Sequence, residues 1–247
     1  MDFVTTADST RLHFKDWGTG RPVILIAYDR RGFGRSSQPW QGYDYDTLAG
    51  DLATLIAQTG VQDAVLVGFS MGGGEVARYM SRHGGRSVAK AILVSSVLPY
   101  RLKTPDNPAG TEQATFDKSA QAMKQDRARF FSGFFRTFFG VGTGASPVSQ
   151  ELLDWARGVA MQASMKATLE CARSFSRTDF RGDLPAFKVP TLIIHGTEDK
   201  TVPIDASSRA AAKGIPGCTL IEYEGAPHGL FATHKTRLTK DLLEFIG

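Results

Sequence analysis

The fold is decided by the stretch Ala64-Val65-Leu66-Val67-Gly68-Phe69-Ser70-Met71-Gly72, in which an apolar run leads into a G-x-S-x-G pentapeptide. Helix-compatible residues follow it, from Gly73 to His83. A strand that turns sharply into a helix is the context in which this motif presents a serine hydroxyl as a nucleophile. The flanking glycines are expected to be needed because such a turn leaves no room for side chains. The sequence therefore predicts Ser70 as a catalytic nucleophile.

A serine nucleophile needs a base to take its proton and an acid to orient that base. Two acids, Glu198 and Asp199, follow a buried-type strand, and Asp205 is a weaker candidate inside the next predicted helix. His228 lies in a loop just after another predicted strand and is the candidate base. Because the carboxyl ends of parallel strands meet at one edge of a sheet, we expect these groups to converge on Ser70.

The remaining histidines are weaker candidates for catalysis. His195 stands before a glycine at a strand end and is expected to be structural. His13 lies in a predicted hairpin, while His83 and His234 are expected on the surface at helix ends.

Strands alternate with helices along most of the chain, which predicts an α/β protein with a mostly parallel, doubly wound sheet. Residues 99–184 differ, because they are mostly helical and rich in phenylalanine. We therefore expect residues 1–98 and 185–247 to form the core and residues 99–184 to form an inserted helical cap. The predicted elements outside the motif are a hairpin at 2–6 and 11–16, strands at 23–28, 91–97, 191–195 and 219–223, and helices at 46–58, 204–213 and 233–246.

Composition narrows the class of protein and its partners. The 247 residues carry a net charge of +4, but the lysines and arginines are scattered, so we expect no nucleic-acid partner. No stretch has the length and apolarity of a membrane span, and the first residues do not resemble a signal peptide. Cys171 and Cys218 are far apart, which predicts reduced structural thiols. These features predict a cytoplasmic protein that binds neither membranes nor nucleic acid.

A run of phenylalanines between Phe130 and Phe139 has two interpretations. One is a cap helix packed on the core, which is the commoner use of such residues. The other is an apolar acyl pocket over Ser70, lined by some of the rings. Different rings can serve the two purposes.

At this point the sequence resembles a known family, the cofactor-free bacterial haloperoxidases of the α/β-hydrolase fold, which are perhydrolases and esterases. The resemblance extends over essentially the whole chain. The matching segments are Phe3-Val4-Thr5-Thr6, Lys15-Asp16-Trp17-Gly18-Thr19-Gly20, Tyr28-Asp29-Arg30-Arg31-Gly32-Phe33-Gly34-Arg35-Ser36-Ser37-Gln38-Pro39-Trp40, Val67-Gly68-Phe69-Ser70-Met71-Gly72-Gly73-Gly74-Glu75-Val76-Ala77-Arg78-Tyr79, Leu102-Lys103-Thr104, Phe175-Ser176-Arg177-Thr178-Asp179-Phe180 and Ala226-Pro227-His228-Gly229-Leu230.

The resemblance implies a nucleophile at Ser70, an acid at Asp199 and a base at His228. It also implies that the backbone N–H of Met71 is one donor of the oxyanion hole. Enzymes of this family resemble esterases in mechanism: water or peroxide attacks an acyl-enzyme, and the peracid so formed oxidises halide. The resemblance implies no haem, metal or other cofactor.

The sequence departs from the family between Ile26 and Ala27. Relatives have there a His-Gly-aromatic-Pro loop, a helix and a further strand before the Asp-Arg-Arg-Gly loop, and here that βα module is missing. In the family the deleted loop supplies the second oxyanion donor. We therefore expect a half-built oxyanion hole and weakened activity. Loss of a helix also exposes apolar surface, which favours association into a homo-oligomer.

These observations predict a serine hydrolase that acts on small carboxylic esters, with perhydrolase activity implied by the resemblance. A lactonase or an amidase with the same triad is an alternative within enzymes. A catalytically dead hydrolase-fold protein that binds a small ligand or a partner is an alternative from another class. The triad residues favour an enzyme, and the deletion favours a binding protein.

Overall fold

The computed structural model of the protein describes residues 2–16, 26–142 and 146–247. Near the N-terminus, β1 (Phe3–Thr5), β2 (Arg11–Asp16) and β3 (Ile26–Tyr28) form a three-stranded sheet in which both pairings are antiparallel. This confirms the predicted hairpin. Residues 23–25 of the predicted strand at 23–28 lie outside the described residues.

The second sheet is parallel throughout and has the order β4 (Ala64–Phe69), β5 (Val88–Val94), β6 (Thr191–Gly196) and β7 (Thr219–Tyr223). The parallel sheet is as predicted, although β5 begins and ends three residues earlier. We expected one sheet; among the described residues there are two, because β3 pairs with β2 and not with β4. One edge of β4 consequently has no partner strand in the part of the chain that the structure describes.

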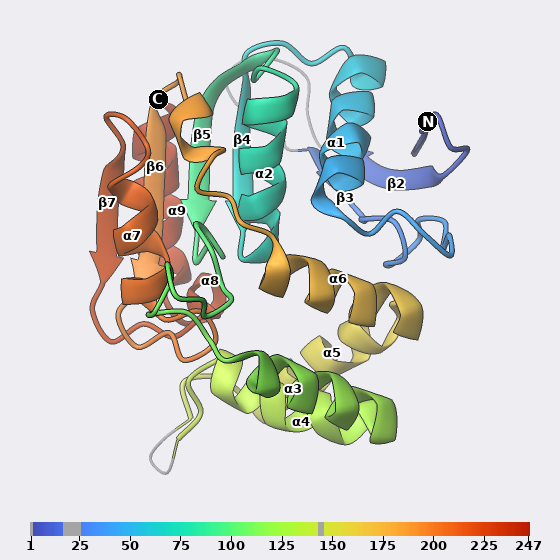
Figure 1. Cartoon of the computed structure of the whole chain (residues 1–247), viewed down its shortest axis with the longest axis vertical. Coiled ribbons are helices and arrows are strands. Elements are labelled where there is room, and N and C mark those ends of the chain that lie inside the picture. The colour runs from blue at the N-terminus through green and yellow to red at the C-terminus, as the bar shows by residue number, and fades with distance from the viewer. Residues whose placement is uncertain (1, 17–25, 143–145) are drawn as a thin grey trace.

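Helices cover both faces of the parallel sheet (Figure 1). Alternate residues of β5 explain this, because Ala91 and Leu93 belong to one apolar cluster while Ile92 and Val94 belong to another. The first cluster includes residues of α1 (Tyr45–Thr59), α2 (Met71–Arg82) and α7 (Ser208–Ala212). The second includes residues of α8 (Leu230–Thr233) and α9 (Lys235–Ile246).

The helix ends follow from local sequence. At the start of α1 the carboxylate of Asp44 accepts a hydrogen bond from the backbone N–H of Thr47, and Gly60 ends the helix with φ of 71°. The predicted helix at 204–213 is interrupted instead: a 3₁₀ turn, η2 (Ile204–Ala206), precedes α7. The predicted helix at 233–246 is observed as α9, with the short α8 before it.

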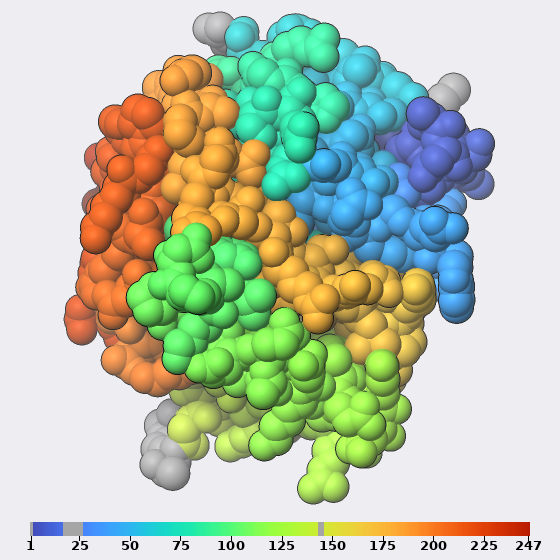
Figure 2. All heavy atoms as spheres, viewed as in Figure 1, coloured from blue at the N-terminus to red at the C-terminus, as the bar shows by residue number. Residues whose placement is uncertain are grey.

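The described residues of the insertion between β5 and β6 form four α-helices, namely α3 (Gln113–Gln125), α4 (Arg127–Phe138), α5 (Gln150–Met161) and α6 (Met165–Arg177). A 3₁₀ turn, η1 (Leu184–Ala186), leads from α6 back to β6. The insertion lies beyond the end of the sheet toward which the arrows of β5 and β7 point (Figure 1), and its atoms form a layer across the lower part of the molecule in Figure 2. None of the described helices is both long and apolar enough to cross a membrane.

Candidate active site

Ser70 occupies the turn between β4 and α2 with φ of 52° and ψ of −117°, a conformation that non-glycine residues rarely adopt. Backbone hydrogen bonds hold it there. The N–H of Ser70 donates to the carbonyl of Val94 over 2.8 Å, and its carbonyl accepts from Gly73 and Val97. The neighbouring strand and the first turn of α2 therefore fix the position of the hydroxyl.

The glycines of the motif are not equally necessary. A Cβ added to Gly68 would lie 2.7 Å from the carbonyl oxygen of Gly72, and one added to Gly73 would lie 2.1 Å from the Oγ of Ser96. A Cβ added to Gly72 would meet no atom of the described residues within 4 Å. The expectation that both flanking glycines are sterically required is thus correct for Gly68 and wrong for Gly72.

Asp199 lies in the loop after β6, and its carboxylate is 0% exposed. Its Oδ1 accepts hydrogen bonds from the backbone N–H groups of Thr201 and Val202, over 2.9 and 2.7 Å. Its Oδ2 lies 2.6 Å from Nδ1 of His228 and 3.1 Å from Nε2 of His195. Each carboxylate oxygen is therefore held by two donors.

His228 connects this carboxylate to the serine. A deprotonated carboxylate has no proton to give, so Nδ1 of His228 is the donor to Asp199. In the neutral ring Nε2 then accepts, and it lies 2.9 Å from the Oγ of Ser70. The structure thus brings Ser70, His228 and Asp199 together in the order that the sequence predicted.

The electrostatics of the pair suit a base that is neutral near pH 7. Burial lowers the pKa of His228 below its ordinary value, and the hydrogen bond and charge of Asp199 only partly oppose this effect. Burial would raise the pKa of Asp199, but the hydrogen bonds from His195 and His228 outweigh it and hold that pKa far below its ordinary value. Asp199 is therefore ionised and His228 is able to accept a proton.

The other candidate acids lie apart from the histidine. Glu198 points to the surface, where its carboxylate pairs with Lys200 over 2.7 Å. Asp205 lies in η2 and pairs with Arg209, also over 2.7 Å. Only Asp199 contacts His228 among these three.

His195 has a closer relation to the site than the sequence suggested. Its Nε2 lies near two acceptors, the carbonyl of Val202 at 2.8 Å and the carboxylate of Asp199, so this nitrogen carries the proton. Its Nδ1 accepts from the Oγ of Ser208 over 2.6 Å. The spacing of four residues between His195 and Asp199 at a strand end was the available signal.

The remaining histidines do not contact the three aligned residues. His13 is buried beside Asp29, whose carboxylate lies 3.2 Å from its ring. His83 stacks on Tyr79, and His234 lies against Tyr223 at the end of α8.

A cavity of about 1450 Å³ contains Ser70 and His228 and extends beneath the insertion. The rings of Phe130, Phe131, Phe134 and Phe138 line it. Phe138 also contacts His228, with 4.8 Å between ring centroids. Phe139, by contrast, is 1% exposed in an apolar cluster of the insertion. Both interpretations of the phenylalanine run therefore hold, for different rings.

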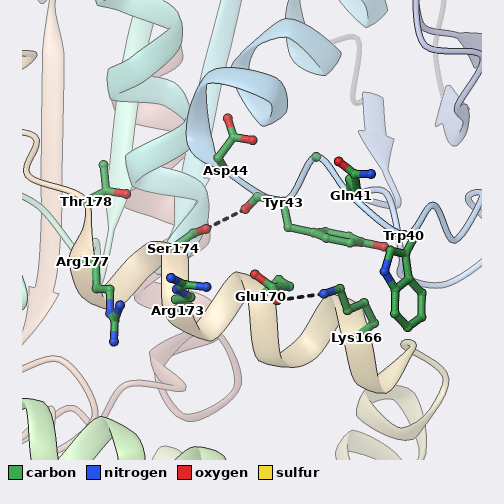
Figure 3. A pocket seen from close by; sticks show the side chains of 11 residues that line it. Trp40, Gln41, Tyr43, Asp44, Lys166, Glu170, Arg173, Ser174, Arg177 and Thr178 are labelled. Atoms are coloured by element: carbon green, nitrogen blue, oxygen red, sulfur yellow. Dashed lines mark hydrogen bonds and ion pairs between the residues drawn. The ribbon is translucent and has the colours of Figure 1, made fainter.

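A second hollow, of about 400 Å³, is lined by residues 40–44 and by polar residues of α6 (Figure 3). Polar side chains dominate it, and its visible contacts are an ion pair between Lys166 and Glu170 and a hydrogen bond from Ser174 to the carbonyl of Tyr43. Neither Ser70 nor His228 lines it. The larger cavity is therefore the candidate substrate site.

The N–H of Met71 has no acceptor inside its helix because Met71 is the first residue of α2. It follows the nucleophile directly, which is the position of an oxyanion donor. The loop expected to supply a second donor would follow Ile26, where Ala27 continues β3 directly. Both cysteines are free, with Cys171 buried and Cys218 partly buried. No group of three or more His, Cys, Asp or Glu side chains among the described residues is arranged to hold a metal ion.

Known proteins resemble this chain over essentially its whole length. A family model described as the α/β hydrolase fold matches residues 25–235. The non-heme chloroperoxidase of Streptomyces lividans is 40% identical over 279 aligned positions, which cover 100% of this chain and 99% of that protein. The bifunctional esterase/perhydrolase DCH of Acinetobacter calcoaceticus is 37% identical over 275 positions, with 100% and 99% covered. A bromoperoxidase structure from Bacillus anthracis has a TM-score of 0.93 at 38% identity, covering 99% of this chain and 98% of that one.

A parallel sheet with a helical insertion, and a serine held at a strand-to-helix turn, define the class of α/β-fold serine hydrolases. Sequence identity to relatives over the full length of the chain identifies the family within this class. The chain belongs to the non-heme haloperoxidase and perhydrolase family of the α/β-hydrolase fold.

Proposed function

We propose that this chain cleaves small carboxylic esters through an acyl-enzyme on Ser70, with His228 as base and Asp199 as the acid that orients it. The hydrogen-bonded series from Ser70 through His228 to Asp199 is the observation that carries the proposal. A relative named as an esterase and perhydrolase supports it.

In the proposed reaction the Oγ of Ser70 bonds to the ester carbonyl carbon while Nε2 of His228 takes its proton. The N–H of Met71 stabilises the resulting oxyanion. The alcohol leaves with the proton from His228, and the acyl group remains on Ser70. Water then attacks the acyl carbon and gives its proton to His228, which passes it to the Oγ of Ser70 as the bond to the acyl group breaks and the acid is released. Peroxide in place of water releases a peracid.

We also propose that a βα module is missing after Ile26 and that the oxyanion hole lacks its second donor. The alignment with DCH supports this, because it runs over 275 positions although this chain has 247 residues. The separation of β3 from β4 is a second support, as is Val67 on β4, which is 51% exposed. Loss of one such donor slows the reaction by a factor of about 100–1000.

The proposed domain division keeps residues 1–98 and 185–247 as the core and residues 99–184 as the cap. It is supported by the position of α3–α6 over the cavity that contains Ser70. The exposed apolar side chain on β4 supports the further proposal that copies of the chain associate.

A fluorophosphonate probe tests the nucleophile. We expect labelling of the folded protein at Ser70 alone, loss of labelling in Ser70→Ala, and hydrolysis of 4-nitrophenyl acetate that depends on the same residue. A matched control is Ser95→Ala, because Ser95 is buried nearby and bonds to the carbonyl of His228 without touching the His228 ring nitrogens. Absence of labelling in folded protein would instead favour a binding protein.

A further inference from the structure

Arg101 is a buried cation in the cavity that contains the catalytic serine. It lies between β5 and α3, its residue is 4% exposed, and it lines the same cavity as Ser70 and His228. A guanidinium group does not lose its proton in proteins. A buried guanidinium therefore needs either an anion or a full set of hydrogen-bond acceptors.

The described residues give Arg101 neither. Its Nη2 donates to the carbonyl of Thr201 over 3.2 Å and to the hydroxyl of Thr111 over 3.4 Å, and both acceptors are uncharged. Its Nε is buried with no acceptor. No carboxylate of the described residues lies within ion-pair distance. Asp199 attracts Arg101 at longer range, but both of its oxygens are already held by other donors.

The surroundings reinforce the positive charge. Basic side chains that line the cavity outnumber the acidic ones, which are Asp117, Asp126 and Glu170. Glu170 is neutralised by Lys166, and Asp126 caps the start of α4. Clefts of low dielectric lined by one sign of charge concentrate ligands of the opposite sign. The apolar rings of α4 fill much of the remaining wall, so a ligand with an apolar part and one negative charge fits this lining.

We propose that Arg101 binds a free carboxylate on the substrate, so that the preferred esters are half-esters of short dicarboxylic acids. The proposal rests on the ester hydrolysis proposed above and names its substrate class. Arginine is suited to this task because charged N–H donors bind carboxylates more strongly than neutral donors do. The competing role is structural: Arg101 bonds to Thr201, whose N–H holds Asp199, and so it could act only as a brace for the acid loop.

Two esters with the same acyl length separate these roles, 4-nitrophenyl hemiglutarate with a free carboxylate and 4-nitrophenyl methyl glutarate without one. We expect Arg101→Met to lower the ratio of kcat/KM for the anionic ester over the neutral one by about tenfold or more, the value of one charged hydrogen bond. Arg101→Lys should restore part of that ratio. Lys118→Met removes an exposed charge from α3 that does not line the cavity and should leave the ratio within about twofold, because exposed charges are screened.

An equal loss for both esters in Arg101→Met would show a brace for the acid loop and overturn the proposal. Calorimetry on Ser70→Ala measures binding of the carboxylate separately from catalysis, because binding needs no turnover. Monomethyl glutarate should bind more tightly than dimethyl glutarate, and adding Arg101→Met should remove the difference. Equal binding of the two compounds overturns the carboxylate site, whereas the ester hydrolysis itself fails only if Ser70 is neither labelled nor needed for turnover. If Arg101→Met does not fold, the Ser70→Ala binding comparison alone decides.

Discussion

At the scale of single residues, the hydrogen-bond donors around Asp199 explain why this residue is the acid of the site. Asp199 is fully buried yet keeps its charge, because two backbone N–H groups and two histidines direct hydrogen bonds at its oxygens. Glu198, its neighbour in sequence, points to solvent and pairs with Lys200. Adjacent residues of an extended turn point apart, so only one of the two can face His228.

Substitution of the two acids should therefore give very different results. Asp199→Asn should lower kcat for 4-nitrophenyl acetate by about ten-thousandfold, because an amide does not hold His228 in the required tautomer. Glu198→Gln, the matched control, should change kcat by about twofold at most, as surface substitutions do. Steady-state kinetics on the two variants decide; retention of activity in Asp199→Asn with loss in Glu198→Gln would show that the acid is wrongly assigned.

The pH dependence should report the lowered pKa of His228. Protonated His228 cannot take the proton of Ser70, so activity is lost as the pH falls through this pKa and is constant above it. Because burial lowers the pKa, the midpoint of kcat/KM for a neutral ester should lie below the ordinary histidine value of about 6.5. A midpoint above that value would mean that His228 is not the titrating base.

At the scale of elements, the β4–α2 turn depends on one glycine more than on the other. Gly68 faces the backbone of Gly72 and Gly73 at 2.7 Å, where a methyl group requires the main chain to move. Gly72 faces open space among the described residues and lies in the first turn of α2. The motif is therefore constrained mainly at its first glycine and at Ser70.

Alanine at these two glycines makes a matched pair. Gly68→Ala should lower the free energy of unfolding by about 1–3 kcal/mol, the usual cost of overpacking, and should disturb Ser70. Gly72→Ala should leave stability unchanged or raise it by about 0.5–1 kcal/mol, because alanine favours a helix over glycine. Urea unfolding measures both. Equal destabilisation by the two substitutions would contradict the assigned packing.

At the scale of the whole molecule, the two sheets leave the edge of β4 without a partner strand among the described residues. Val67 on that strand is half-exposed, whereas strands of parallel α/β sheets are usually buried on both faces. The proposed missing module, a loop, a helix and a strand, would account for both observations. The same proposal implies that the N–H of Met71 acts without a second oxyanion donor.

Insertion of a family-like loop, helix and strand after Ile26 should raise the turnover number for 4-nitrophenyl acetate by about a hundredfold, the value of one oxyanion donor. The insertion should also cover β4 and reduce association, which sedimentation at several concentrations measures. A control insertion of equal length without the His-Gly-aromatic-Pro loop should leave turnover unchanged. No gain in a folded insertion variant, or full activity already in the present chain, would contradict a half-built oxyanion hole.

The sequence by itself determined the features that depend on local pattern. An apolar run before G-x-S-x-G predicted β4, the turn and α2. The order of Ser70, Asp199 and His228 predicted the aligned residues, since parallel strands end at one edge of a sheet. The end of α1 at Gly60 also follows from local sequence, because glycine readily adopts the left-handed conformation that ends many helices.

Only the tertiary structure showed the contacts that each residue makes with segments distant in the sequence. The contact of His195 with Asp199, the freedom around Gly72 and the division of the strands into two sheets arise from packing between segments far apart in the chain. The same holds for Arg101, whose lack of a carboxylate partner is visible only once the walls of the cavity are assembled. Local pattern fixes which residues can react, because it sets strand ends and turns. Burial and partners are properties of the assembled core, so the charge states and the substrate preference follow only from the folded molecule.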